Sequence, residues 1–146
     1  AEITRALAAP AADDPEFPLV LSAGVRTHWT ANTIHRDPSW RKGKGPHCPI
    51  WLSTEDAAQL GLGDDDVALL TTRIGSARLV VRIDDRLQAG HVVVPNGFGA
   101  RYQADDGGLM ESDGVNLNEL TAASDRDPFT GCPHHKTVAC RVIAAA

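Results

Sequence analysis

Residues 52–99 read LSTEDAAQLGLGDDDVALLTTRIGSARLVVRIDDRLQAGHVVVPNGFG, one helix-like stretch followed by several apolar runs. Ser53 or Thr54 can accept a hydrogen bond from the first helical turn, and helix-forming residues follow. Gly61 suits the left-handed backbone position that ends many helices. The pattern therefore predicts a helix of about two turns that ends at Gly61.

The apolar runs predict short strands, because they are rich in Val and Leu and are bounded by Gly, Pro and Asp. Across the whole chain such runs begin at Leu19, Ile50, Val67, Ala77, His91 and Lys136. Gly75 is expected to turn the chain between two of these strands, and one further helical turn is expected near residues 118–123. Six strands with one or two short helices predict a mainly β fold, a small closed barrel, since closure removes exposed strand edges.

The bulk composition is that of one globular domain: 146 residues, 42% hydrophobic and 23% charged. A net charge of −5 argues against a nucleic-acid partner, which usually selects a basic face. The apolar runs are too short to span a bilayer, and no signal peptide is recognisable, so we expect no membrane insertion. Three cysteines, an odd count, favour a reducing, cytoplasmic setting.

The first residues differ in composition from the rest of the chain. Residues 1–16 are dominated by Ala, Pro and acidic side chains without a sustained apolar period, which is typical of a linker or an interdomain arm. Residues 17–146 are expected to form the barrel domain. The chain begins at Ala1 rather than Met, and we expect it to be an excised piece of a longer protein or a processed chain.

A polar segment follows the first expected strand. From Arg26 onward it reads RTHWTANTIHRD, a density of hydrogen-bonding groups that neither a core strand nor a simple surface loop requires. Arginine and threonine side chains can bind a pyrophosphate, and asparagine offers donors and an acceptor to a heterocyclic ring. The segment therefore predicts one wall of a cleft for a small anionic ligand.

At this point the sequence resembles the C-terminal, dinucleotide-binding domain of the molybdopterin oxidoreductases of the dimethyl sulfoxide reductase family, which includes formate dehydrogenases and nitrate reductases. The polar segment is similar to the family's first cofactor loop, and NELTAASDRDPFTGCPHHKTVACRV near the end is similar to its closing motif. Within residues 52–99 the matching positions are Asp56-Ala57, Leu60-Gly61, Asp66-Val67, Gly75, Ala89-Gly90 and Pro95-Asn96-Gly97.

The resemblance implies a six-stranded double-psi β-barrel that binds molybdopterin guanine dinucleotide, with molybdenum or tungsten held by other domains of the parent oxidoreductase. Those domains would be its partners, and the isolated domain would be catalytically inactive. The cofactor-binding residues that it implies are Gly24, Arg26, His28, Trp29, Thr30, Asn32, Thr33, Asn118 and Lys136.

The sequence leaves other interpretations open. A double-psi barrel can also serve as a protein-binding module of a larger ATPase or complex. A self-processing enzyme of barrel fold would need a Gly–Ser cleavage site, and Gly75-Ser76 is the one such pair.

Simpler roles also remain possible for single residues. Asn118 could simply cap a turn, and Trp29 could simply pack. A zinc site built from CPHH, residues 132–135, with Cys48 and His47 lacks the tight paired spacing of structural zinc sites.

Overall fold

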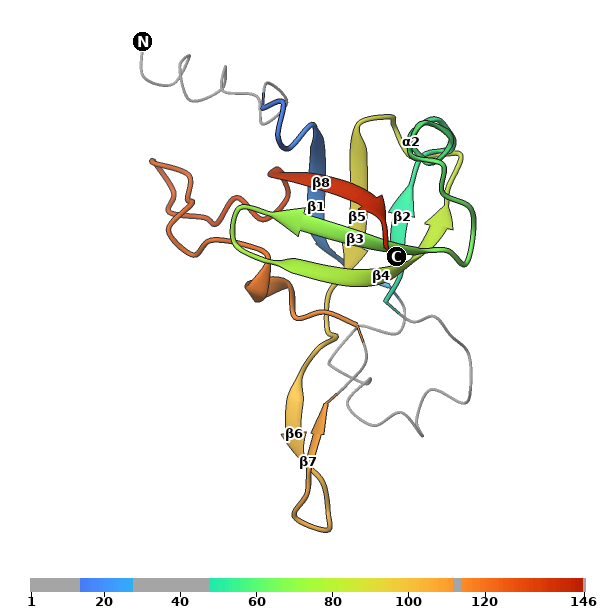
Figure 1. Ribbon diagram of the computed structural model, residues 1–146. Coiled ribbons are helices and arrows are strands. Elements are labelled where there is room, and N and C mark those ends of the chain that lie inside the picture. Colours follow the sequence, from blue (N-terminus) through green and yellow to red (C-terminus); the bar gives the residue numbers. More distant parts are fainter. Residues whose placement is uncertain (1–13, 28–47, 112–113, 146) are drawn as a thin grey trace.

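The structure is a computed structural model that describes residues 14–27, 48–111 and 114–145 (Figure 1). Six strands form a closed barrel in the order β1-β5-β2-β4-β3-β8. Their bounds are β1 Leu19–Val25, β2 Ile50–Leu52, β3 Val67–Thr72, β4 Ser76–Ile83, β5 His91–Pro95 and β8 Val138–Ala144. This confirms the predicted mainly β fold and its closed six-stranded barrel.

Two pairs of neighbouring strands are parallel, β1 with β5 and β2 with β4, and the remaining neighbours are antiparallel. Four strands begin at the predicted residue. β4 begins one residue before Ala77, and β8 begins two residues after Lys136. The later start of β8 has a local cause, because residues 135–137 turn and Thr137 donates to the carbonyl oxygen of His134 at 3.5 Å.

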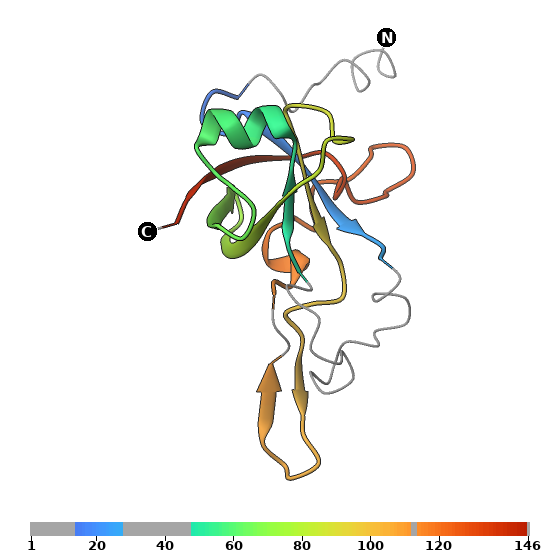
Figure 2. The ribbon, with the colours of Figure 1, turned by 90° about the vertical axis from the view of Figure 1, so that its right-hand side faces the viewer.

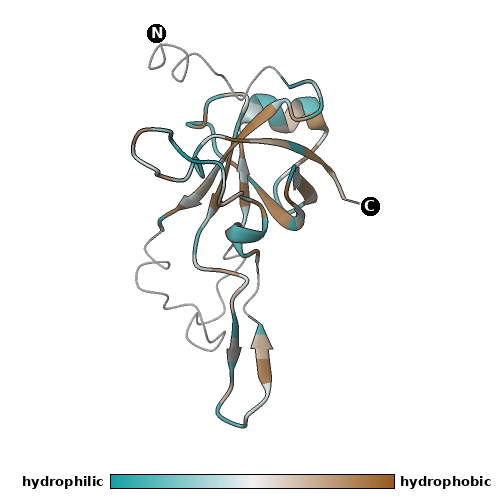
Figure 3. Ribbon diagram, turned by 90° about the vertical axis from the view of Figure 1, so that its left-hand side faces the viewer, coloured by the Kyte–Doolittle hydropathy of each residue, from teal (hydrophilic) through white to brown (hydrophobic). Residues whose placement is uncertain are grey.

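Alternate side chains of the strands fill the barrel, as the period-2 geometry of a strand requires. The strands are mostly apolar in the colouring of Figure 3. Each large aliphatic side chain buried in this way stabilises the fold by about 1.5–3 kcal/mol. The inward positions that are almost completely buried are Leu21, Ile50, Leu52, Ala68, Leu70, Leu79, Val81, Val92, Val94, Cys140 and Val142.

The helix α2, Thr54–Leu60, has the predicted ends. Ser53 is its N-cap and accepts from the backbone N–H of Asp56 at 3.0 Å, and Gly61 adopts φ 65° at its C-cap. The buried carboxylate of Asp56 accepts from the Ser53 hydroxyl at 2.7 Å and from the backbone N–H of Gly90 at 2.9 Å. The helix is thereby attached to the turn that precedes β5 (Figure 2).

A two-stranded hairpin, β6 Arg101–Gln103 and β7 Leu109–Glu111, was not predicted. The ADDGG sequence, residues 104–108, forms the hairpin turn, in which the Asp106 carboxylate accepts from the backbone N–H of Gly108 at 2.9 Å. The hairpin extends from the barrel at the end opposite α2 (Figures 1 and 2). Its Leu109 is 77% exposed.

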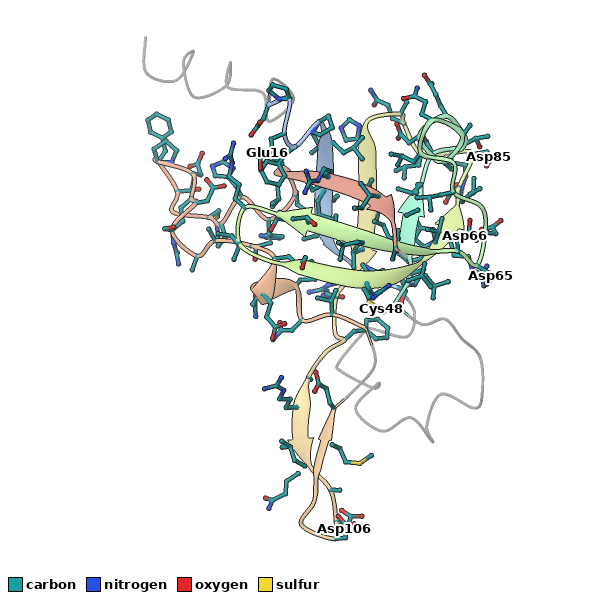
Figure 4. The ribbon with its side chains drawn as sticks, in the orientation of Figure 1. Glu16, Cys48, Asp65, Asp66, Asp85 and Asp106 are labelled. Atoms are coloured by element: carbon teal, nitrogen blue, oxygen red, sulfur yellow. The ribbon has the colours of Figure 1, made fainter. Side chains whose placement is uncertain are left out.

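The acidic turn before β3, residues 64–66, is solvent-exposed. Asp65 forms an ion pair with Arg82 at 2.8 Å, and Asp66 accepts from the backbone N–H of Gly63 at 2.7 Å. Figure 4 places both aspartates at the outer edge of the molecule.

Candidate functional site

The candidate site lies at the carboxyl ends of the parallel strands β1 and β5. The two strands pair from Val20 with His91 to Val25 with Pro95, so the segments that follow them leave the barrel at the same end. The backbone N–H of Asn96 donates to the carbonyl oxygen of Val25 at 3.2 Å, which joins the two exits. In parallel sheets this edge is where ligands commonly bind.

Gly24 forms the centre of this site. The β1–β5 register shifts between Ala23 and Val25, and Gly24 takes φ +85° at the resulting bulge. A Cβ at this position would lie 3.7 Å from Asn96 Cβ, 3.7 Å from Lys136 Nζ and 3.8 Å from Leu117 Cδ1. Segments from four parts of the chain therefore meet around a backbone that carries no side chain.

Lys136 supplies a positive charge at the same place. Its ammonium donates to the carbonyl oxygen of Ala23 at 2.8 Å, and partial desolvation there lowers the pKa of Lys136. A lysine ammonium has three donors, so this single bond leaves it able to contact an anion as well.

The short 3₁₀ helix η4, Leu117–Glu119, contributes the opposite wall. Asn116 caps it by accepting from the backbone N–H of Asn118 at 3.1 Å, so the cap is Asn116, and the capping role considered for Asn118 is wrong. The side chain of Asn118 is exposed. A cavity of about 280 Å³ opens beside it, lined by Asn96, Gly97, Phe98, Ala100, Asn116, Leu117 and Asn118.

Close packing holds the two chain segments that line this cavity together. Gly99 has φ +64°, and a Cβ there would collide with the backbone of Asn116. Any side chain at this position would push the segment after β5 away from η4. The glycine therefore sets the width of the cavity.

Gly24 lies beside Lys136 and Leu117, and Leu117 belongs to η4 together with Asn118. The cofactor contacts of these three residues stay predictions. Arg26 follows β1 immediately and is exposed. Other predicted residues lie outside the described part of the chain, namely His28, Trp29, Thr30, Asn32 and Thr33.

Sequence reasoning missed Asn96 as a site residue. Its side-chain oxygen is buried and lacks a hydrogen-bond partner in the described ranges 14–27, 48–111 and 114–145. One sequence feature could have pointed to a site here: PNG, residues 95–97, stands at the end of an apolar strand. Gly97 of this PNG sequence has φ 90°.

The residues considered for zinc do not form a ligand set among the residues that the structure describes. Within those residues no group of three or more His, Cys, Asp and Glu side chains is close enough to hold a metal ion. Cys48, labelled in Figure 4, is buried and lies two residues before β2, whereas Cys132 is exposed. His47 lies outside the described residues.

The donor set fits a ligand that carries both an anion and a polar ring. Lys136 and the open backbone at Gly24 suit a phosphate, which needs a positive charge and close approach. The amides of Asn96 and Asn118 and the apolar Phe98 and Leu117 suit the edge and face of a heterocycle.

These features define a β-barrel domain with a candidate site for a small ligand at one end. Residues 19–139 match the Molydopterin dinucleotide binding domain family, and the chain belongs to this family.

Two curated relatives are nitrate reductases. The chain is 38% identical to the nitrate reductase of Symbiobacterium thermophilum over 76 residues, which is 50% of this chain and 10% of that protein. It is 33% identical to the periplasmic nitrate reductase of Desulfovibrio desulfuricans over 84 residues, 56% of this chain and 11% of that protein. The chain therefore spans about a tenth of the length of these relatives.

A solved structure shows the same fold. Acetylene hydratase from Pelobacter acetylenicus superposes with a TM-score of 0.74 over 89% of this chain and 19% of that chain, at 20% identity.

In the part of the chain that the structure describes, we find no helix long and apolar enough to cross a membrane.

Proposed function

We propose that this chain binds a molybdopterin dinucleotide at the barrel end where β1 and β5 finish, as one domain of a larger molybdenum- or tungsten-dependent oxidoreductase. The family match over residues 19–139 carries the proposal. The position of the site is supported by Asn96 and Leu117, which lie beside Gly24 and also line the cavity next to Asn118.

Each residue at the site would have a separate task. Lys136 would hold a phosphate oxygen with its ammonium, and Gly24 would let the pyrophosphate approach the backbone of β1. Asn118 would bind a ring edge through its amide. The bound cofactor would supply the redox chemistry, while this domain would orient it and shield it from water.

The guanine form of the dinucleotide remains our proposal, as do contacts from Arg26 and from the polar side chains of residues 28–33. Binding within the segment after β1 is supported by its position, since it leaves the barrel directly at Gly24 and Val25. The two parallel pairs β1–β5 and β2–β4 support a double-psi topology for the barrel.

The parent protein is proposed to be an oxidoreductase similar to nitrate reductases and formate dehydrogenases, with its other domains as the partners of this one. The two curated relatives named above support the comparison with nitrate reductases. We propose that the isolated domain is catalytically inactive. A protein-binding module is not favoured, because the matching family is one of dinucleotide-binding domains.

We propose that the protein is located in the cytoplasm. The odd count of three cysteines supports a reducing compartment. The periplasm is the alternative, since one relative carries that word in its name.

The pterin and metal content of the full-length parent protein tests the function. We expect near-stoichiometric molybdenum or tungsten, with pterin and guanine released on acid denaturation. Lys136→Met should lower the retained pterin, whereas Arg141→Met, an exposed cation on β8, should not. A parent protein without pterin or metal, made in cells that load this cofactor, would refute the proposal.

A further inference from the structure

Asn96 lies in the candidate site, but it is not one of the residues assigned above to the phosphate. It follows the last residue of β5 and lines the cavity of about 280 Å³ with Phe98, Leu117 and Asn118. Its backbone is fixed by the 3.2 Å bond to Val25, and its Cβ lies close to Gly24. The position of the amide at the site is therefore determined by β1 and β5.

The side-chain oxygen of Asn96 is shielded from solvent, and no residue in the described part of the chain donates a hydrogen bond to it. A buried acceptor without a donor costs free energy, and folded proteins contain few of them. Asn χ2 is a soft torsion, so the amide can turn toward a ligand in the cavity that it lines. A bound ligand with a correctly placed donor would recover the lost hydrogen bond.

The chemistry of the oxygen restricts which part of a ligand it can contact. An amide oxygen only accepts, and phosphate oxygens also accept, so the two do not bind each other. Lys136 and the Gly24 backbone suit the phosphate, whereas Asn96 needs an N–H or O–H donor, which the edge of a ring can supply. A pterin and a guanine share such a donor, the 2-amino group of a 2-amino-4-oxopyrimidine edge.

We propose that Asn96 accepts a hydrogen bond from the 2-amino group of this ring edge and so determines specificity for 2-amino-4-oxopyrimidines. This inference rests on the proposed function, since it names the part of the dinucleotide that one residue recognises. It makes Asn96 a binding residue and assigns it no part in the chemical step.

Paired probes that differ at this one group test the inference. The full-length parent protein, freed of cofactor, is titrated with pterin against lumazine, which has an oxygen in place of the amino group. It is also titrated with guanosine monophosphate against inosine monophosphate, which lacks the group. We expect the wild type to bind the amino compound of at least one pair about tenfold more tightly, and the pair that discriminates identifies the ring.

Three variants show whether Asn96 causes the preference. Asn96→Leu removes the acceptor and should abolish the discrimination, while Asn96→Asp keeps an acceptor of the same shape and should retain it. Gln59→Leu removes an exposed amide from α2 and should behave as wild type. The unliganded Asn96→Leu protein should melt no lower than wild type, because the substitution removes a buried acceptor without a donor.

The inference is overturned if the wild type shows no preference in either pair, or if Asn96→Leu keeps the wild-type preference. It is also overturned if Asn96→Asp loses discrimination while it remains folded. The pterin content of the loaded parent protein is measured separately. A loaded parent whose probes show no role for Asn96 would refute this inference and leave the proposed function intact.

Discussion

Gly24 controls how closely a ligand can approach the end of β1. Its φ of +85° is costly for any L-residue, and a Cβ there would occupy the space in front of Lys136 Nζ. Gly90 has a similar φ of +82°, but nothing lies within 4 Å of the position of its Cβ. The two glycines therefore carry similar backbone strain on substitution but differ in what surrounds them.

We predict that Gly24→Ala and Gly90→Ala each destabilise the protein by about 1–2 kcal/mol, because both force a left-handed conformation on alanine. Only Gly24→Ala should also reduce the pterin retained by the parent protein. Urea unfolding measures the first effect, and pterin content after gel filtration measures the second. Equal retention in the two variants would show that the Gly24 backbone is not approached by the ligand.

The thiols of Cys132 and Cys140 should differ in reactivity. Cys140 is completely buried in β8, and burial raises its pKa to about 12, whereas Cys132 is exposed. At pH 8 we expect iodoacetamide to modify Cys132 in the folded protein and to leave Cys140 unmodified, since the thiolate is the nucleophile. Peptide mass spectrometry gives the sites, and equal labelling of the two would contradict the buried position of β8.

The same raised pKa gives a pH dependence of stability. The folded state holds the Cys140 proton more tightly than the unfolded state, whose thiol has an ordinary pKa of 9.0. The stabilisation is therefore complete below pH 9 and is lost as the pH rises toward about 12. Cys140→Ala should show a shallower loss of stability across this range in urea unfolding, and an unchanged slope would contradict the shift.

The buried side chain of Asp56 helps to hold helix α2 to the barrel, beside the buried Ala57. The Asp56 carboxylate accepts from the Ser53 hydroxyl and from the backbone N–H of Gly90. The neighbouring Glu55 is also in the first helical turn but is exposed. Removing the buried carboxylate would leave both donors without their partner.

We predict that Asp56→Ala destabilises the protein by about 2 kcal/mol or more, from the lost helix-terminal bonds and the unsatisfied buried donors. Glu55→Ala should cost less than about 1 kcal/mol, mainly through the helix dipole. Denaturant midpoints of the two variants make the comparison. Similar losses would mean that the contact to Gly90 does not stabilise the helix position.

The barrel strands and α2 could be predicted because their signals are local. Alternating apolar residues, Ser53 and Gly61 each specify their own element. The hairpin β6–β7 could not, because Arg101–Gln103 and Leu109–Glu111 are short and face no core. Their pairing depends on the turn between them, and two short strands carry little apolar pattern of their own.

The site was predictable to a lesser degree. Gly24, Asn118 and Lys136 stand in motifs that the sequence itself displays, whereas the role of Asn96 depends on contacts between distant segments. Its buried oxygen is a property of the folded barrel, in which Asn96 bonds through its backbone to Val25 and lies beside Gly24.

The two ends of the barrel differ in what they carry. One end bears α2, and the opposite end bears the candidate site and the hairpin (Figures 1 and 2). The curated relatives are about ten times as long as the part that this chain matches. We therefore infer that the site end forms one wall of a cofactor site that other domains of the parent complete.

Hydrogen–deuterium exchange on the full-length parent, compared with and without its cofactor, tests this account most directly. We predict that bound cofactor slows exchange in peptides covering residues 23–27, 96–99 and 116–119, and leaves α2, Thr54–Leu60, unchanged. Protection confined to α2 and the turn at Gly90, with none around Gly24 and Asn96, would place the ligand at the other end of the barrel and contradict the account.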